Sequence, residues 1–187
     1  MNAKVVVVLV LCMSFSLSAE AQEFDVTLSN ESAQFRYIIK SNGGFGNSEI
    51  DFGALYTQSN DTVGMAGIQV VDEAGSGSPG LSVGLGAKAF VANTDSYDII
   101  AAAVGGQLRY SPPSMKRFGV SASAFYSPDI ICFMDARNFL YTSARLEYEL
   151  LAQARVYLGY RRVTAKIKNQ SDDTLDSDIH LGMQILF

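Results

Sequence analysis

Residues 177–187 read SDIHLGMQILF, and this closing stretch decides the fold class. Apolar side chains recur there at every second position up to a final aromatic: Ile179, Leu181, Met183, Ile185 and Phe187. A period of two places all five on one face of a β-strand. A soluble sheet can alternate in the same way but rarely stops on a terminal Phe. The stretch therefore indicates the last strand of an outer-membrane β-barrel.

The first residues indicate export from the cytoplasm. Lys4 precedes an apolar run over residues 5–17, and Ala19-Glu20-Ala21 supplies small residues around a cleavage position. This pattern is typical of a secretory signal peptide, so we expect residues 1–21 to be removed and residues 22–187 to form one barrel domain. The apolar run is shorter than the roughly 20 residues of a membrane-spanning helix. A lipoprotein site at Cys12 is disfavoured because the large Leu11 precedes it.

The composition of the mature chain excludes several functions. Removal of Lys4 and Glu20 with the signal leaves 13 Lys+Arg (14 − 1) against 18 Asp+Glu (19 − 1), a net charge of −5. This acidity, without a basic stripe, argues against nucleic-acid binding. Cys132 is the one cysteine outside the signal, so a disulfide framework or a cysteine metal site is not expected. We predict no cofactor and no metal site.

Alternating segments fill the rest of the chain and predict an antiparallel, up-and-down, monomeric barrel. Eight segments suit tilted membrane strands of roughly 9 to 11 residues: 48–57, 62–71, 80–91, 98–110, 117–126, 139–149, 152–164 and 177–187. Two shorter alternating pieces within residues 24–40 allow one more hairpin and ten strands. Large porins need about 16 strands and are excluded, whereas a soluble β-sandwich stays open because it would show the same alternation.

The connections should divide between two ends of such a barrel. Counted back from a periplasmic C-terminus, residues 127–138 and 166–176 become outer loops. Residues 111–114 and 150–151 become tight inner turns, and residues 72–79 become a longer inner turn. Tyrosines at or near the strand ends, together with Phe187, should anchor the barrel at the lipid headgroups: Tyr56, Tyr110, Tyr126, Tyr148 and Tyr160.

Parity along the strands assigns a charged and polar set to the lumen. Leu140, Leu146 and Leu158 fall on the lipid side, and the opposite side receives Glu49, Asp51, Lys88, Arg109, Arg145, Glu147, Glu149, Arg155, Arg161, His180 and Gln184. Side chains fill a barrel of about eight strands, and unpaired charges there are costly. We therefore expect a largely plugged, ion-paired lumen in a protein of structural or surface-interaction role. The alternative is a narrow channel for ions or small solutes, in which some of those pairs open.

Three further features bear on possible chemistry. His180 is the single histidine and would need a neighbouring serine and acid to serve a lipid-modifying enzyme; parity turns it inward, so we predict no catalytic residues and no enzyme activity. The acidic stretch 169–178 lacks the central Gly and terminal Glu of a calcium loop and is expected to be a solvated loop; if it has a ligand, divalent ions that bridge lipopolysaccharide phosphates are the natural candidate. Cys132, within the apolar run IICFM, packs on the rim or contacts a partner.

Four runs, in this order, resemble the YfaZ family of small proteobacterial outer-membrane proteins: AAAVGGQLRY at 101–110, FYSPD at 125–129, LGYRRV at 158–163 and LGMQILF at 181–187. GLGAKAF at 84–90 fits as well, and the similarity covers roughly residues 48–187. The segment 22–47 and the apolar loop around Cys132 depart from it.

The resemblance implies a signal-bearing, porin-like barrel in the outer membrane of a Gram-negative bacterium, with no catalytic or binding residues to carry over. Its expected partners are outer-membrane lipid and lipopolysaccharide. Barrel-insertion machinery recognises the closing strand of such barrels in general, so Ile179, Leu181, Met183, Ile185 and Phe187 are the expected assembly signal.

Overall fold

A computed structural model describes residues 21–43, 46–75, 78–94, 97–167 and 172–187. The predicted signal peptide lies almost wholly outside these residues. The elements are β1 (Ala21–Ser29), β2 (Ser32–Gly43), β3 (Gly46–Thr57), β4 (Thr62–Glu73), β5 (Leu81–Asn93), β6 (Asp98–Tyr110), β7 (Phe118–Ser127), the 3-10 helix η1 (Asp129–Ile131), β8 (Cys132–Met134), β9 (Ala136–Leu151), β10 (Ala154–Ile167) and β11 (Asp172–Leu186). No helix in the described ranges is long and apolar enough to cross a bilayer.

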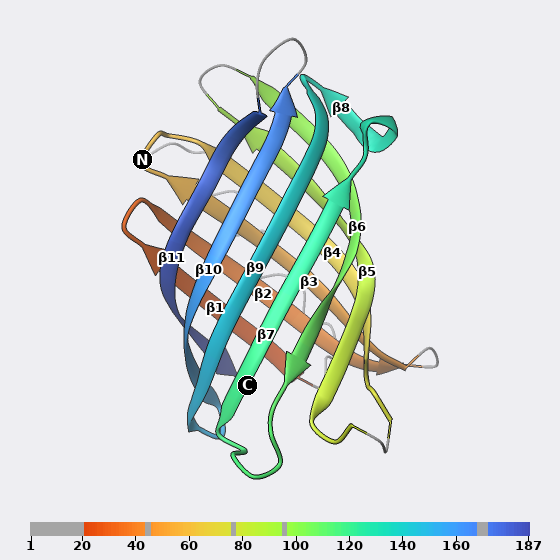
Figure 1. Ribbon diagram of the computed structural model, residues 1–187, viewed down its shortest axis with the longest axis vertical. Helices are drawn as coiled ribbons and strands as arrows, with labels where there is room; N and C mark the ends of the chain where they lie inside the picture. The colour runs from red at the N-terminus through yellow and green to blue at the C-terminus, as the bar shows by residue number, and fades with distance from the viewer. Residues whose placement is uncertain (1–20, 44–45, 76–77, 95–96, 168–171) are drawn as a thin grey trace.

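Ten long strands among the described residues close into one antiparallel barrel (Figure 1). Each strand pairs with its neighbours in the chain, and β11 returns to β1, where Gln22 and Phe187 exchange backbone hydrogen bonds of 2.9 Å. The pairing of β5 with β6 completes the ring. This closure excludes the β-sandwich alternative, because a sandwich has two separate sheets.

The larger of the two predicted strand counts is the one found. Residues 24–40 contribute β1 and β2, which pair over eight positions from Ala21↔Lys40 to Leu28↔Ala33. On β1, Glu23, Asp25 and Thr27 are buried inside the barrel while Leu28 is 57% exposed outside.

Gln22 and Phe187 lie together at one end of the barrel, the end marked C in Figure 1, which we call the terminal end; the opposite end is the loop end. The described residues between strands are 74–75, 78–80, 111–117 and 152–153 at the terminal end, and 30–31, 58–61, 94, 97 and 128–135 at the loop end. The predicted sidedness of the connections is therefore found, but long and short connections occur at both ends. The two long terminal-end connections are joined by a hydrogen bond from Ser111 N to Gly80 O of 2.8 Å.

Two predicted loops are more structured than expected. In residues 127–138, η1 bulges from the wall and β8 then pairs with Ile99–Ala101 of β6, continuing the line of β7. This packing buries Cys132 at the loop end. The acidic stretch 169–178 lies partly outside the described residues, but its second half belongs to β11, where Asp176 is buried and faces Arg161. The expectation of a solvated acidic loop is therefore wrong for this half, because a buried cation holds the carboxylate.

Candidate functional site in the barrel interior

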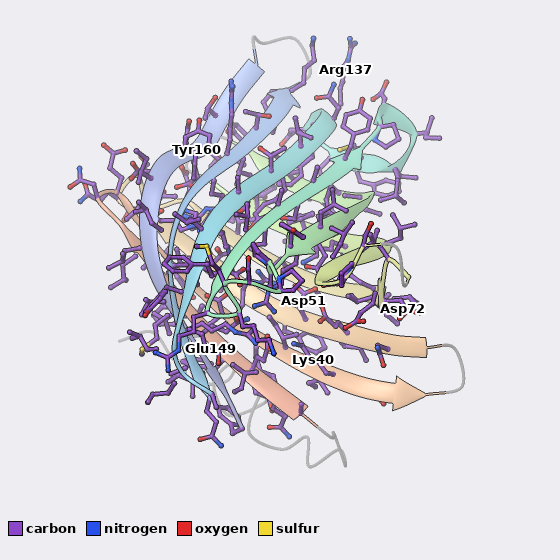
Figure 2. All side chains as sticks on the ribbon, turned by 60° about the horizontal axis from the view of Figure 1, so that its bottom comes forward. Lys40, Asp51, Asp72, Arg137, Glu149 and Tyr160 are labelled. Atoms are coloured by element: carbon purple, nitrogen blue, oxygen red, sulfur yellow. The ribbon has the colours of Figure 1, made fainter. Side chains whose placement is uncertain are left out.

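The barrel interior is the candidate site because nearly all buried polar and charged side chains of the described residues lie there. The structure turns the predicted lumen residues inward from six strands: Glu49 and Asp51 (β3), Lys88 (β5), Arg109 (β6), Arg145, Glu147 and Glu149 (β9), Arg155 and Arg161 (β10), and His180 and Gln184 (β11). The five apolar residues of the closing strand lie on the other face, with Ile179 65% and Leu181 64% exposed. Figure 2 shows Asp51 and Lys40 within the ring of strands and Tyr160 outside it.

Asp25 of β1 is the centre of a layer of charged side chains that crosses the middle of the barrel interior. Its Oδ2 accepts a hydrogen bond from Arg145 Nη1 at 2.8 Å, and its Oδ1 accepts one from the Tyr157 hydroxyl. Arg145 also stacks on the Tyr157 ring, 4.4 Å from the guanidinium carbon to the ring centre. Thr27 approaches the Tyr157 hydroxyl at 2.6 Å. This one carboxylate thus ties β1 to β9 and β10.

Arg36 extends the layer to the far wall. Its guanidinium lies between two carboxylates, 3.9 Å from Asp25 and 3.8 Å from Asp51. Asp51 in turn binds Lys88 Nζ at 2.8 Å. The result is an alternating chain of charges from β5 to β9: Lys88, Asp51, Arg36, Asp25 and Arg145. We call these five residues the ionic layer. Sequence reasoning missed Asp25 and Arg36, although parity within β1 and β2 would have turned both inward.

Glycines on neighbouring strands make room for these long side chains. A Cβ on Gly182 would lie 2.2 Å from Tyr157 Cζ, and one on Gly67 would lie 2.7 Å from Lys88 Cγ. In both cases the large residue is the direct register partner of the glycine. The two glycines therefore let Tyr157 and Lys88 lie flat against the barrel wall, closer than a register partner with a Cβ would permit.

Arg161 forms a second buried polar group, nearer the loop end. Its Nε donates to Asp176 at 2.7 Å, its Nη1 to Gln34 Oε1 at 2.5 Å and its Nη2 to Ser32 Oγ at 2.8 Å. The residue is 1% exposed. Such complete pairing is what allows a cation to remain in this position.

An apolar layer fills the loop end of the lumen. Its buried members come from β3 to β11 and are Leu55, Val63, Met65, Phe90, Ala92, Ile99, Ala101, Ala103, Phe125, Cys132, Ala136, Phe139, Tyr141, Val163, Ala165, Ile167 and Leu175. Phe90 is its centre, 4.7 Å from the Phe139 ring and 5.6 Å from the Tyr141 ring. Packed side chains thus fill the lumen at the loop end, where an open barrel would hold water.

The terminal end of the lumen is hollow instead. A cavity of about 210 Å³ lies below the ionic layer, and a more open hollow of about 350 Å³ at the rim shares Lys40 and Glu49 with it. Most of its charges are paired: Lys40 with Glu23 and, at 3.7 Å, with Glu49, and Arg109 with Glu147 at 3.0 Å. Arg155 also lines the cavity but has no ion pair within 4 Å among the described residues.

His180 is buried and lies over Gly159, edge-on to Tyr157 with ring centres 5.9 Å apart. Neither of its ring nitrogens has a hydrogen-bond partner within the part of the chain that the structure describes. No serine or carboxylate is hydrogen-bonded to it there. Described residues also bring no group of three or more His, Cys, Asp or Glu side chains together in a metal-binding arrangement.

The geometry defines the class: a closed ten-stranded β-barrel with an ion-paired interior and an apolar outer wall. The chain belongs to the YfaZ family, whose model, described as "YfaZ precursor", matches residues 1–187. No curated protein matches.

Solved structures that resemble it include a KdgM porin in complex with disordered oligogalacturonate (12% identity, TM-score 0.45) and the KdgM porin by itself (11%, TM-score 0.45). Each match covers 89% of this chain and 99% of the other. A third, entitled "Unveiling the Mechanism Behind the in-meso Crystallization of Membrane Proteins", has 14% identity and a TM-score of 0.43 over 89% of this chain and 82% of the other.

Proposed function

We propose that the protein is a closed, non-conducting barrel of the bacterial outer membrane, whose role is structural or is carried out at its surface. The observation that carries this proposal is the apolar layer at the loop end, backed by the ionic layer in the middle. Ions avoid a dry apolar constriction because they would lose their hydration there. Two unlike barriers in series therefore separate the terminal-end cavity from the loop end.

The outer wall supports the membrane placement. Every long strand except β2 exposes at least one large apolar side chain to 45% or more, for example Leu85 at 69%, Val104 at 58% and Leu146 at 54%. In water such a wall would be a severe aggregation liability, whereas lipid covers it. Tyr56 and Tyr126 lie on the outer wall toward the loop end, and Tyr110, Tyr148 and Phe187 lie toward the terminal end, whereas Tyr160, predicted near a strand end, lies in the middle of β10. Two such aromatic girdles are typical of membrane barrels.

A narrow channel is the second candidate, and the terminal-end cavity with Arg155 favours it. A solute entering there would meet the bond between Arg145 and Asp25 and, beyond it, the apolar layer. Conduction would require both to move. A conducting barrel would give discrete current steps across a planar bilayer, whereas a closed one would not.

A lipid-modifying enzyme is the least favoured class. Its chemistry would require a nucleophile and an acid beside a histidine that reaches lipid. His180 faces the interior and its nitrogens have no partner among the described side chains. We propose that the protein has no enzyme activity.

Leu158→Arg tests the lipid-facing wall. Leu158 is 54% exposed and lies between Leu146 and Leu181 in register, so the charge would enter the bilayer near its middle. We expect the free energy of unfolding in lipid vesicles to fall by about 2 to 4 kcal/mol, measured by urea titration. Leu158→Met is the matched control and should cost less than about 1.5 kcal/mol. Equal stability of the two variants would show that this wall does not face lipid.

A further inference from the structure

The cations of the outer wall are confined to one patch. Of the Lys and Arg residues that the structure describes, seven turn into the lumen: Arg36, Lys40, Lys88, Arg109, Arg145, Arg155 and Arg161. Lys116 and Arg117 lie in a terminal-end connection. The other three, Arg137, Arg162 and Lys166, are exposed on the neighbouring strands β9 and β10, near the loop end. We call these three residues the basic patch.

The register brings the three cations together. Arg162 pairs with Thr142 and Lys166 pairs with Asn138. At the next position the register shifts, so that Ile167 pairs with Ala136 and Arg137 is the extra residue. A bulge of this kind redirects a side chain, and here it leaves Arg137 exposed beside the pair of Lys166 and Asn138. Figure 2 shows Arg137 on the outside of the barrel, above Tyr160.

Along β10, from the terminal end to the loop end, the outward-facing side chains change from apolar to cationic. From the terminal end it presents Val156 and Leu158, then Tyr160, then Arg162, Thr164 and Lys166. The Tyr160 hydroxyl is 2.8 Å from Ser177 Oγ, which fixes the ring at this level. Lys166 lies eight residues beyond Leu158, about 27 Å along the strand at about 3.4 Å per residue, which is about 19 Å along the bilayer normal for a strand tilted by about 45°. This exceeds half of the roughly 30 Å hydrocarbon thickness, so Lys166 and the adjoining Arg137 reach the level of the lipid phosphates.

We propose that the basic patch binds the phosphate groups of lipopolysaccharide, while the acyl chains of the same molecule lie on Leu146, Leu158 and Leu181. This rests on the proposed function, which places the loop end in the outer leaflet. Arg162 and Lys166 are four residues apart, about 14 Å along the strand, so two separated phosphates suit the patch better than one. Guanidinium groups bind phosphate in a bidentate manner, and two of the three cations are arginines.

The test uses the folded mature protein in detergent micelles, titrated with diphosphorylated lipid A and with dephosphorylated lipid A, with bound lipid counted by native mass spectrometry. A cation near an anionic lipid surface contributes about 1 kcal/mol, which is about fivefold in affinity. The combined variant Arg137→Ala, Arg162→Ala and Lys166→Ala should therefore bind diphosphorylated lipid A on the order of 100-fold more weakly. The control Lys116→Ala with Arg117→Ala should bind like the parent.

Two results would overturn the lipid site: equal binding of the two lipids by the parent protein, or equal loss in the patch variant and the control variant. The exposed positions leave the interior untouched, and protease resistance of each variant in vesicles checks that it is folded and inserted. Failure of the parent to insert would contradict the membrane placement itself. Failure of the patch variant alone to lose binding would contradict only the lipid site.

Discussion

Asp25→Ala is expected to lower the free energy of unfolding by about 3 to 5 kcal/mol, the cost of leaving a buried charge without its partner. Asp25 is 1% exposed and lies within 4 Å of the guanidinium groups of Arg145 and Arg36. Its removal leaves Arg145 without an ion pair, and Arg36 with Asp51 alone, among the described residues. Urea titration of the refolded protein in vesicles measures the effect.

Glu73→Ala is the matched control, because Glu73 is an exposed carboxylate at the terminal end of β4 and has no ion pair with a described residue. Its replacement should change the stability by less than about 0.5 kcal/mol. Asp25→Asn should fall between the two, since the amide oxygen still accepts a hydrogen bond while the negative charge is lost. If Asp25→Ala were as stable as Glu73→Ala, the ionic layer would not hold the barrel together.

Phe90→Ala is expected to have an effect of similar size, about 3 to 5 kcal/mol. Phe90 is fully buried in the apolar layer, against the rings of Phe139 and Tyr141. Truncation removes these contacts and leaves a cavity that the surrounding strands cannot close, because their hydrogen-bonded register fixes the wall. The same urea titration measures the loss.

Phe90→Leu controls for this variant because it keeps an apolar side chain of nearly the same size, and it should cost less than about 1.5 kcal/mol. A small and equal loss in both variants would mean that the loop end of the lumen is loosely packed. The apolar layer would then be a weak barrier, and the channel hypothesis would gain support.

Strand alternation predicted much of the wall. The period of two in residues 139–149 and 152–164 placed Leu146 and Leu158 outside and Arg145 and Arg161 inside, which is where the structure has them. The reason is physical: one face of such a strand meets lipid and the other a polar lumen, so the two faces differ in polarity at nearly every step.

Alternation could not predict the apolar layer. At the loop end the inner face is as apolar as the outer one, as in Phe90 beside Val91 or Ile99 beside Ile100, with the first residue of each pair buried and the second exposed. Polarity then carries no information about the face. Only the register between strands brings Phe90, Phe139 and Tyr141 to one height in the lumen.

The sequence alone also could not show which residues pair with each other in the ionic layer. Parity gives the face of a residue but neither its height in the barrel nor its position around the ring. Arg145 was predicted to turn inward, yet its partner Asp25 lies 120 positions earlier in the chain. Gly67 and Gly182 make room for Lys88 and Tyr157, and these pairings follow only from the register.

Single-channel recording of the mature protein, residues 22–187, in a planar bilayer at high salt tests the closed barrel most directly. Insertion is verified in the same lipid by protease resistance. The apolar layer and the ionic layer predict a silent bilayer at moderate voltage. Discrete, reproducible current steps that change in size or ion preference in Arg145→Ala or Glu147→Ala would contradict closure and establish a path through the lumen.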